Sequence, residues 1–179
     1  MDIARFEILY KTYQPGLVNF AYFYLKNEQE AIDTVQELFM NIWEKREAFP
    51  TTENPKAYLM TAVKHRCFNK LNRNKVQNNS LDTLEEVIIS PDTTLSNLEA
   101  KQTEAAIKNA INTLPEKCKE IFILSRYEQL SYKEIANVLG ISAKTVENQI
   151  GNAIKVIRKS ILIFLSLIIS VLETIFKIT

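Results

Sequence analysis

Glycine and proline are scarce in this chain, whose 179 residues include 3 glycines and 5 prolines. Glycine-lined phosphate loops and turn-rich β architectures both need residues that accept positive φ, so the scarcity argues against both. Helices remain, and a composition of 46% hydrophobic and 24% charged residues is typical of a folded protein. At this length we predict an all-α fold of two small helical domains, each with a modest core.

Cysteine is equally sparse, since Cys67 and Cys118 are the two in the chain. They lie far apart and form no CxxC pattern, which indicates neither a zinc site nor a disulfide scaffold. We expect two buried thiols and no bound metal. The sequence also lacks a recognisable nucleophile with its base, metal-ligand cluster or phosphate loop, so we predict no catalytic residue, no cofactor and no enzymatic activity.

The first residues, Met1 to Arg5, lack the basic segment and apolar core of a signal peptide. We therefore expect the protein to stay in the cytoplasm.

Charge is segregated along the chain: residues 28–47 hold six acids against two cations, whereas residues 64–75 hold five cations and no acid. Acidic and basic faces of this kind predict two kinds of partner.

The N-terminal part of the chain, residues 1–75, is expected to form one compact helical bundle. Its helical pattern is broken at Pro15-Gly16, at Lys26-Asn27 and at Phe49-Pro50. Asn54-Pro55 then has the residue types of a helix cap and a first helical position.

Residues 76–97 are polar and acidic, which predicts a linker. Helical periodicity resumes near residue 98, and residues 98–160 are expected to form a second bundle. Breaks at Leu114-Pro115, at Gln129 to Ser131 and at Gly140 should divide this bundle into short helices.

A helix-turn-helix pattern starts at Ser131, which with Glu134 forms a capping box; Gly140 makes the turn and Ser142 caps the next helix. Apolar residues share one face of that second helix, namely Val146, Ile150, Ala153 and Ile157. Polar residues and a glycine share the other face, namely Lys144, Glu147, Asn148, Gly151 and Lys155. Amide and cationic side chains suit the major groove of DNA, although two helices joined at a glycine can also be an ordinary corner.

The helix from Pro55 to about Arg73 has a core stripe and an opposite polar stripe flanked by cations. The core stripe is Met60, Val63, Cys67 and Leu71, and the polar stripe is Tyr58, Thr61, His65, Asn69 and Asn72. A ring and hydrogen-bonding groups between cations suit unpaired bases, which stack and expose polar edges. The alternative is a solvated basic face.

The helix from Glu28 to Lys45 carries an acidic stripe. Its expected core residues are Val35, Leu38, Phe39, Ile42 and Trp43, and its expected exposed residues are Asp33, Gln36, Glu37, Met40 and Glu44. A methionine among acids is more typical of a protein contact than of a solvated face.

Three motifs in this order resemble the extracytoplasmic-function type of sigma-70 factor. They are the segment Asp33 to Trp43, the segment Asn54 to Leu59, and Leu114-Pro115 followed by the helix-turn-helix. The resemblance covers residues 5–160. The string Thr145 to Ile150 looks especially like the group common in Bacteroidetes.

The resemblance implies an N-terminal sigma-2 domain and a C-terminal sigma-4 domain that bind core RNA polymerase and promoter DNA. It implies core polymerase binding by Asp33, Gln36, Glu37, Met40 and Glu44. It implies contacts to the melted minus-10 element by Tyr58, Thr61, His65, Arg66, Asn69, Lys70 and Arg73. It implies contacts to the duplex minus-35 element by Lys144, Thr145, Glu147, Asn148, Asn152 and Lys155. His65 departs from the asparagine frequent there, which puts the base preference in doubt.

Residues 161–179 form an apolar tail, in which residues 160–172 are uncharged. That run is shorter than the roughly 18–20 residues that span a bilayer, so membrane contact is an open but less favoured alternative. We expect the tail to extend the last helix and to bury its apolar surface against the sigma domains, a partner or a second copy. An inhibitory anti-sigma factor, usual for the family resembled, is our hypothesis for a partner that covers part of it.

Two other functions stay open. A LuxR-like regulator would present a similar helix-turn-helix, but it needs an αβ receiver domain, and residues 1–100 show no alternation of strands and helices. An adaptor made of two helical bundles would have no reason to carry both a groove-reading face and a stacking stripe.

Overall fold

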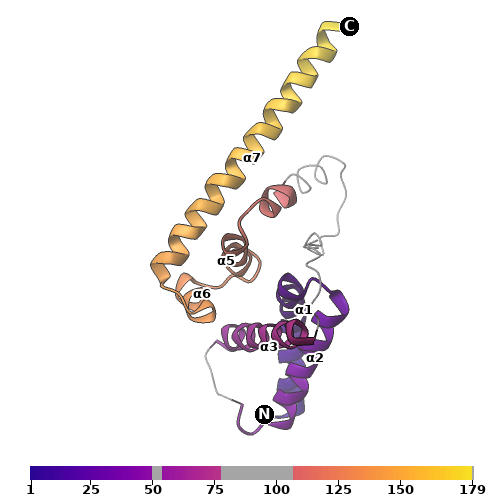
Figure 1. Cartoon of the computed structure of the whole chain (residues 1–179), viewed down its shortest axis with the longest axis vertical. Helices are drawn as coiled ribbons and strands as arrows, with labels where there is room; N and C mark the ends of the chain where they lie inside the picture. Colours follow the sequence, from indigo (N-terminus) through magenta and orange to yellow (C-terminus); the bar gives the residue numbers. More distant parts are fainter. Residues whose placement is uncertain (50–53, 78–106, 179) are drawn as a thin grey trace. The chain divides into compact units, whose positions relative to one another are not determined.

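A computed structural model describes residues 1–49, 54–77 and 107–178 (Figure 1). Within these ranges all regular structure is helical. The chain divides into two compact units: unit 1 comprises Met1–Ile88 and Lys133–Ile141, and unit 2 comprises Ile89–Tyr132 and Ser142–Thr179. The all-α fold with two small units is confirmed.

Helix α1, Ile3–Leu25, begins where the side chain of Asp2 accepts a hydrogen bond of 2.8 Å from the Arg5 amide. It ends at Lys26, whose φ of 55° is left-handed. The next residue, Asn27, accepts a hydrogen bond from the Glu30 amide at 3.0 Å and so starts α2. The predicted break at Lys26-Asn27 is confirmed.

The predicted break at Pro15-Gly16 is wrong, because α1 runs through Pro15 without interruption. Proline in a helix interior removes one hydrogen bond and crowds the preceding turn, at a cost of about 3 kcal/mol. Leu9 before it and Leu17 and Phe20 after it are all buried. Packing on both sides of the proline offsets the local penalty, which the sequence pattern alone does not reveal.

Helix α2, Glu28–Glu44, packs against both α1 and α3 (Figure 1). Val35, Leu38, Phe39 and Ile42 are buried, as predicted, and Ala31 is buried as well. The Phe39 ring lies 4.8 Å from the Tyr10 ring and 6.1 Å from the Phe6 ring, measured between centroids. Trp43 was expected in the core but is only half-buried, since it lies near the end of the helix.

Helix α3, Pro55–Gln77, completes the core of unit 1. Asn54 caps it, because its Oδ1 accepts a hydrogen bond of 3.1 Å from the Ala57 amide. Leu59, Met60, Val63 and Cys67 are buried. The expected core residue Leu71 is half-buried, in the last two turns of the helix.

Unit 2 contains the helical residues 107–112, helix α5 (Glu116–Arg126) and helix α7 (Ala143–Ile178). Its core cluster consists of Ile111, Leu114, Cys118, Phe122 and Ala153, with Tyr127 and Ile157 partly buried against it. The break at Leu114-Pro115 is confirmed. Helix α6, Tyr132–Leu139, falls almost wholly in unit 1, where the backbone oxygen of Val138 accepts a hydrogen bond of 3.2 Å from Lys64 Nζ.

The expectation of short helices fails for α7, which is a continuous helix of 36 residues. After Gly140 the sequence contains no proline and one glycine, Gly151, whose cost of about 1 kcal/mol is too small to end a helix anchored by buried side chains. The tail therefore continues the last helix, as predicted. The predicted linker, apart from Val76 and Gln77 at the end of α3, lies outside the described residues.

Two adjacent residues of α2 provide a matched test of this core. Phe39 is 2% exposed and Met40 is 62% exposed. We expect Phe39→Ala to lower the free energy of unfolding by about 3–5 kcal/mol through cavity formation, and Met40→Ala to change it by about 0.5 kcal/mol or less. Urea unfolding followed by fluorescence of Trp43, the single tryptophan, measures both. Equal losses in the two variants would contradict the packing described.

Candidate functional site

The outward face of α2 is acidic around one large apolar side chain. Gln36, Glu37, Met40 and Glu44 are exposed, and Asp33 is half-buried and accepts a hydrogen bond of 2.8 Å from Gln29. The predicted stripe is therefore present as a surface, with Met40 at its centre. An exposed methionine surrounded by carboxylates has the composition of a protein-binding patch.

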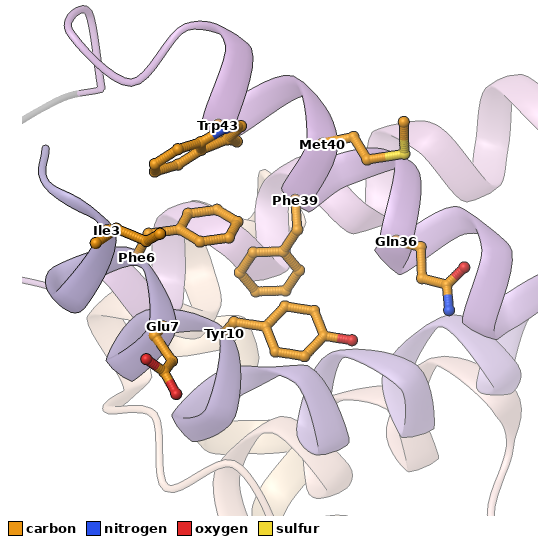
Figure 2. Close-up of a pocket in the computed structure, with 8 residues that line it drawn as sticks. All are labelled: Ile3, Phe6, Glu7, Tyr10, Gln36, Phe39, Met40 and Trp43. Carbon is orange, nitrogen blue, oxygen red and sulfur yellow. The ribbon is translucent and has the colours of Figure 1, made fainter.

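A groove of about 690 Å³ lies beside this face, between α1 and α2 (Figure 2). Its lining residues are Ile3, Phe6, Glu7, Tyr10, Gln36, Phe39, Met40 and Trp43. Gln36 and Met40 belong both to the groove and to the acidic face. Sequence reasoning missed the contribution of α1, although the spacing of Ile3, Phe6 and Tyr10 places them on one side of a helix.

The polar face of α3 is also exposed, as predicted. Tyr58, His65, Asn69 and Arg73 are exposed. Thr61 is half-buried, and its hydroxyl donates a hydrogen bond of 2.9 Å to the backbone oxygen of Ala57. The Tyr58 ring meets the Phe49 ring edge-on at 5.6 Å between centroids.

Two cations on this helix have acidic neighbours on α2. Arg66 Nη1 lies 3.8 Å from Glu37 Oε2, and Lys70 Nζ lies 3.7 Å from Glu30 Oε2. Pairs this exposed stabilise a fold by at most about 1 kcal/mol each, so both cations stay accessible to a stronger anionic partner.

Phe68 is an aromatic residue on α3 that sequence reasoning missed. It is exposed, its ring centroid lies 5.3 Å from that of Tyr24, and Lys64 Nζ lies 6.0 Å from the ring centroid. The signal in the sequence was a phenylalanine within a run that is otherwise polar or basic. A second exposed ring extends the surface on which a flat ligand can stack.

Helix α7 carries the predicted polar face in unit 2. Ser142 caps it, since its Oγ accepts a hydrogen bond of 3.0 Å from the Thr145 amide. Val146, Ile150 and Ala153 are buried as predicted. The predicted contact residues are all exposed, namely Lys144, Thr145, Glu147, Asn148, Asn152 and Lys155. Lys144 pairs with Glu147 at 2.8 Å.

Both cysteines are buried, as predicted. Burial raises the pKa of the Cys67 thiol to about 12 and raises the pKa of the Cys118 thiol in the same direction. The Cys118 thiol donates to the backbone oxygen of Gln149 at 3.3 Å. Since the thiolate is the reactive form, both groups behave as packing residues at neutral pH.

The first part of the tail leaves apolar surface uncovered. Leu162 and Ile163 are exposed, and an apolar groove nearby is lined by Phe122, Arg126, Ile154, Ile157, Arg158, Ile161 and Leu162. Of the three alternatives expected for the tail, burial against the sigma domains is not seen at Leu162 and Ile163, while burial against a partner or a second copy stays a prediction. Within residues 1–49, 54–77 and 107–178, none of the helices has the length and apolar character to span a membrane.

Two protein families match this chain, in the order expected from the motifs. Residues 9–76 match the family Sigma-70 region 2, and residues 104–157 match the family Sigma-70, region 4. The first match contains the acidic face of α2 and the polar face of α3. The second contains α5, α6 and the first part of α7.

Two sigma factors are similar in sequence to this chain over most of its length. The ferric citrate uptake sigma factor FecI of Escherichia coli (strain K12) is 29% identical over 154 residues, which cover 84% of this chain and 87% of FecI. The RNA polymerase sigma factor SigV of Bacillus subtilis (strain 168) is 25% identical over 142 residues, which cover 77% of this chain and 80% of SigV.

Two solved structures share the fold at lower identity. The sigma factor RpoE from Bartonella quintana, in complex with the anti-sigma factor NepR, has a TM-score of 0.67 and 21% identity, covering 89% of this chain and 98% of RpoE. CnrH, in complex with the cytosolic domain of CnrY, has a TM-score of 0.58 and 21% identity, covering 88% of each chain.

An added methyl group should change the free energy of unfolding in opposite directions at two glycines, one just before α7 and one within it. Gly140 has a φ of 69°, which strains alanine, whereas Gly151 lies inside the helix, and a Cβ meets no atom within 4 Å at either position. We expect Gly140→Ala to lower the free energy of unfolding by about 1 kcal/mol and Gly151→Ala to raise it by about 0.5–1 kcal/mol. Urea unfolding followed by circular dichroism tests this. Shifts of the same sign would contradict the assigned backbone.

Proposed function

The chain belongs to the sigma-70 family of RNA polymerase sigma factors, in its extracytoplasmic-function group, and we propose that its two units divide promoter recognition between them. Unit 1 binds core polymerase and the minus-10 element, and α7 reads the minus-35 element. The observation that carries this division is the position of the exposed polar faces: those of α2 and α3 lie in the region 2 match and that of α7 in the region 4 match. Membership of the Bacteroidetes group stays a prediction.

Core polymerase binds the exposed face of α2 through Asp33, Gln36, Glu37, Met40 and Glu44. The support is the combination of an exposed apolar side chain with carboxylates around it. Burial of Met40 supplies affinity, while the acids supply attraction to a basic partner and orientation.

The α3 face engages the melted minus-10 element through Tyr58, Thr61, His65, Arg66, Asn69, Lys70 and Arg73. Tyr58 offers a ring for stacking, and His65 and Asn69 offer exposed hydrogen-bonding groups. Stacking contributes about 1–3 kcal/mol per base, which offsets the few kcal/mol that unstacking a base step costs. Binding energy of this size opens the duplex without a chemical step.

The α7 face reads the minus-35 element in the major groove through Lys144, Thr145, Glu147, Asn148, Asn152 and Lys155. The amides of Asn148 and Asn152 suit base edges, and Lys144 and Lys155 suit phosphates. Gly151 adds no side chain to this face, and a Cβ there would meet open space. The backbone of α7 can therefore approach the groove closely at that point.

The protein acts in the cytoplasm and has no catalytic activity of its own, because polymerase supplies the chemistry. An anti-sigma factor is a further partner, in line with the two structural neighbours, of which RpoE was solved with the anti-sigma factor NepR and CnrH with the cytosolic domain of CnrY. A LuxR-like regulator is not supported, since the αβ receiver it needs has no counterpart in the helical residues 1–49 and 54–77.

Run-off transcription from a promoter library tests the division of labour. With core polymerase, we expect transcripts that depend on this protein and whose start sites share two spaced upstream elements. Asn148→Ala should relax the preference at the upstream element and Asn69→Ala at the downstream element, each by about fivefold to a hundredfold, because a base contact is worth about 1–3 kcal/mol.

Core polymerase with a control sigma factor verifies that the enzyme and library are active. If this protein yields no dependent starts while still binding duplex DNA, a conventional regulator becomes the better interpretation. If Asn148→Ala changes only the downstream element, the assignment of the two faces is wrong.

Removal of residues 161–179 tests whether a partner covers the tail. The anti-sigma factor is first isolated by its binding to the full chain. We expect the deletion to weaken its binding by tenfold or more, because burial of one aliphatic side chain contributes about 1.5–3 kcal/mol. Calorimetric titration measures this, and run-off transcription serves as the control for retained folding. Unchanged affinity would eliminate the tail as part of that interface.

A further inference from the structure

The groove between α1 and α2 has walls built of packed aromatic rings. Phe6 from α1 lies 5.0 Å from Trp43 of α2, and Tyr10 of α1 lies 4.8 Å from Phe39 of α2, measured between ring centroids. Figure 2 shows these rings lying across the space between the two helices. Because each wall is held by contacts to the other helix, the side chains of the groove lose little conformational entropy when a partner binds.

Apolar side chains stand exposed on the two helices that form the groove. Ile3 on α1 is 70% exposed and Met40 on α2 is 62% exposed. Both line the groove and are covered by neither helix. An apolar patch that continues across two elements is the composition expected of a binding surface rather than of scattered surface residues.

The charge around the groove restricts what can fill it. Glu7 is the only one of the lining residues that carries a charge at neutral pH, and a hydrogen bond of 2.6 Å from Lys11 lowers its pKa. On the α2 side the exposed neighbours Glu37 and Glu44 are acidic, while Arg46 lies against the Trp43 ring at 4.8 Å. An apolar side chain carried on a basic element complements such a groove.

We propose that the groove receives apolar side chains of the same polymerase element that binds the α2 face, so that α1 is a second wall of the docking surface. Gln36 and Met40 make the two surfaces continuous, since they line the groove and belong to the proposed polymerase-binding set. Ile3 is then a contact residue for core polymerase. This inference rests on the proposed function for the identity of the partner.

Helix α1 offers a matched control. Ile8 is 67% exposed, almost as much as Ile3, but it does not line the groove. Five residues separate the two, which turns Ile8 about 140° away from Ile3 around the helix. Ile3→Gln and Ile8→Gln therefore remove the same apolar group from opposite sides of one helix, with no change in charge.

The experiment is titration of the full chain against immobilised core polymerase by interferometry. We expect Ile3→Gln to raise the dissociation constant about tenfold, Ile8→Gln to change it less than twofold, and Ile3→Leu to retain near-normal binding. Unfolding midpoints from Trp43 fluorescence serve to confirm that all variants are folded.

The outcomes separate this inference from the proposed function. Normal binding of the parent chain together with equal affinities for Ile3→Gln and Ile8→Gln would overturn the role of the groove and leave polymerase binding intact. If the parent chain did not bind while a control sigma factor bound the same immobilised core polymerase, both the inference and the proposed function would be overturned. Loss with Ile3→Gln that Ile3→Leu restores would establish an apolar contact.

Discussion

The packing of α1, α2 and α3 against one another sets the direction of every proposed contact in unit 1. Burial of Val35, Leu38, Phe39 and Ile42 fixes the rotation of α2, which leaves Gln36 and Met40 on the outside. Helix α3 packs against α1 and α2, so that its polar face also has one orientation. Recognition by this unit thus depends on an apolar core that touches no ligand, and the weak ion pairs between α2 and α3 only adjust the arrangement.

In unit 2 an apolar core likewise determines which side of a helix faces outward. Burial of Val146, Ile150 and Ala153 fixes the rotation of α7, and its polar residues then face outward along the opposite side. Each unit has a small core and a limited contact area, so each alone is expected to bind DNA weakly. Two such sites on one chain bind together more tightly because the first contact raises the effective concentration of the second.

The helix faces could be predicted from the sequence because hydrophobic periodicity determines which side is buried, as Phe39 and Met40 illustrate. The caps at Asn27, Asn54 and Ser142 could be recognised by residue type and position. Pro15 could not, since its tolerance depends on packing along α1. The groove could not be predicted from the sequence either, because periodicity describes one helix at a time, whereas a groove depends on how two helices approach each other. Phe68 and the ion pairs of α3 depend on neighbours in the same way.

Because α7 is continuous, it fixes the angle around the helix axis between the proposed reading face and the tail. A helix advances about 1.5 Å and turns about 100° per residue, so the exposed Leu162 lies about 21 Å beyond Asn148 and about 40° away from it in azimuth. The tail therefore begins on nearly the same side of the helix as the proposed reading face. A molecule seated on Leu162 would therefore lie on nearly the same side of α7 as a duplex bound to the proposed reading face.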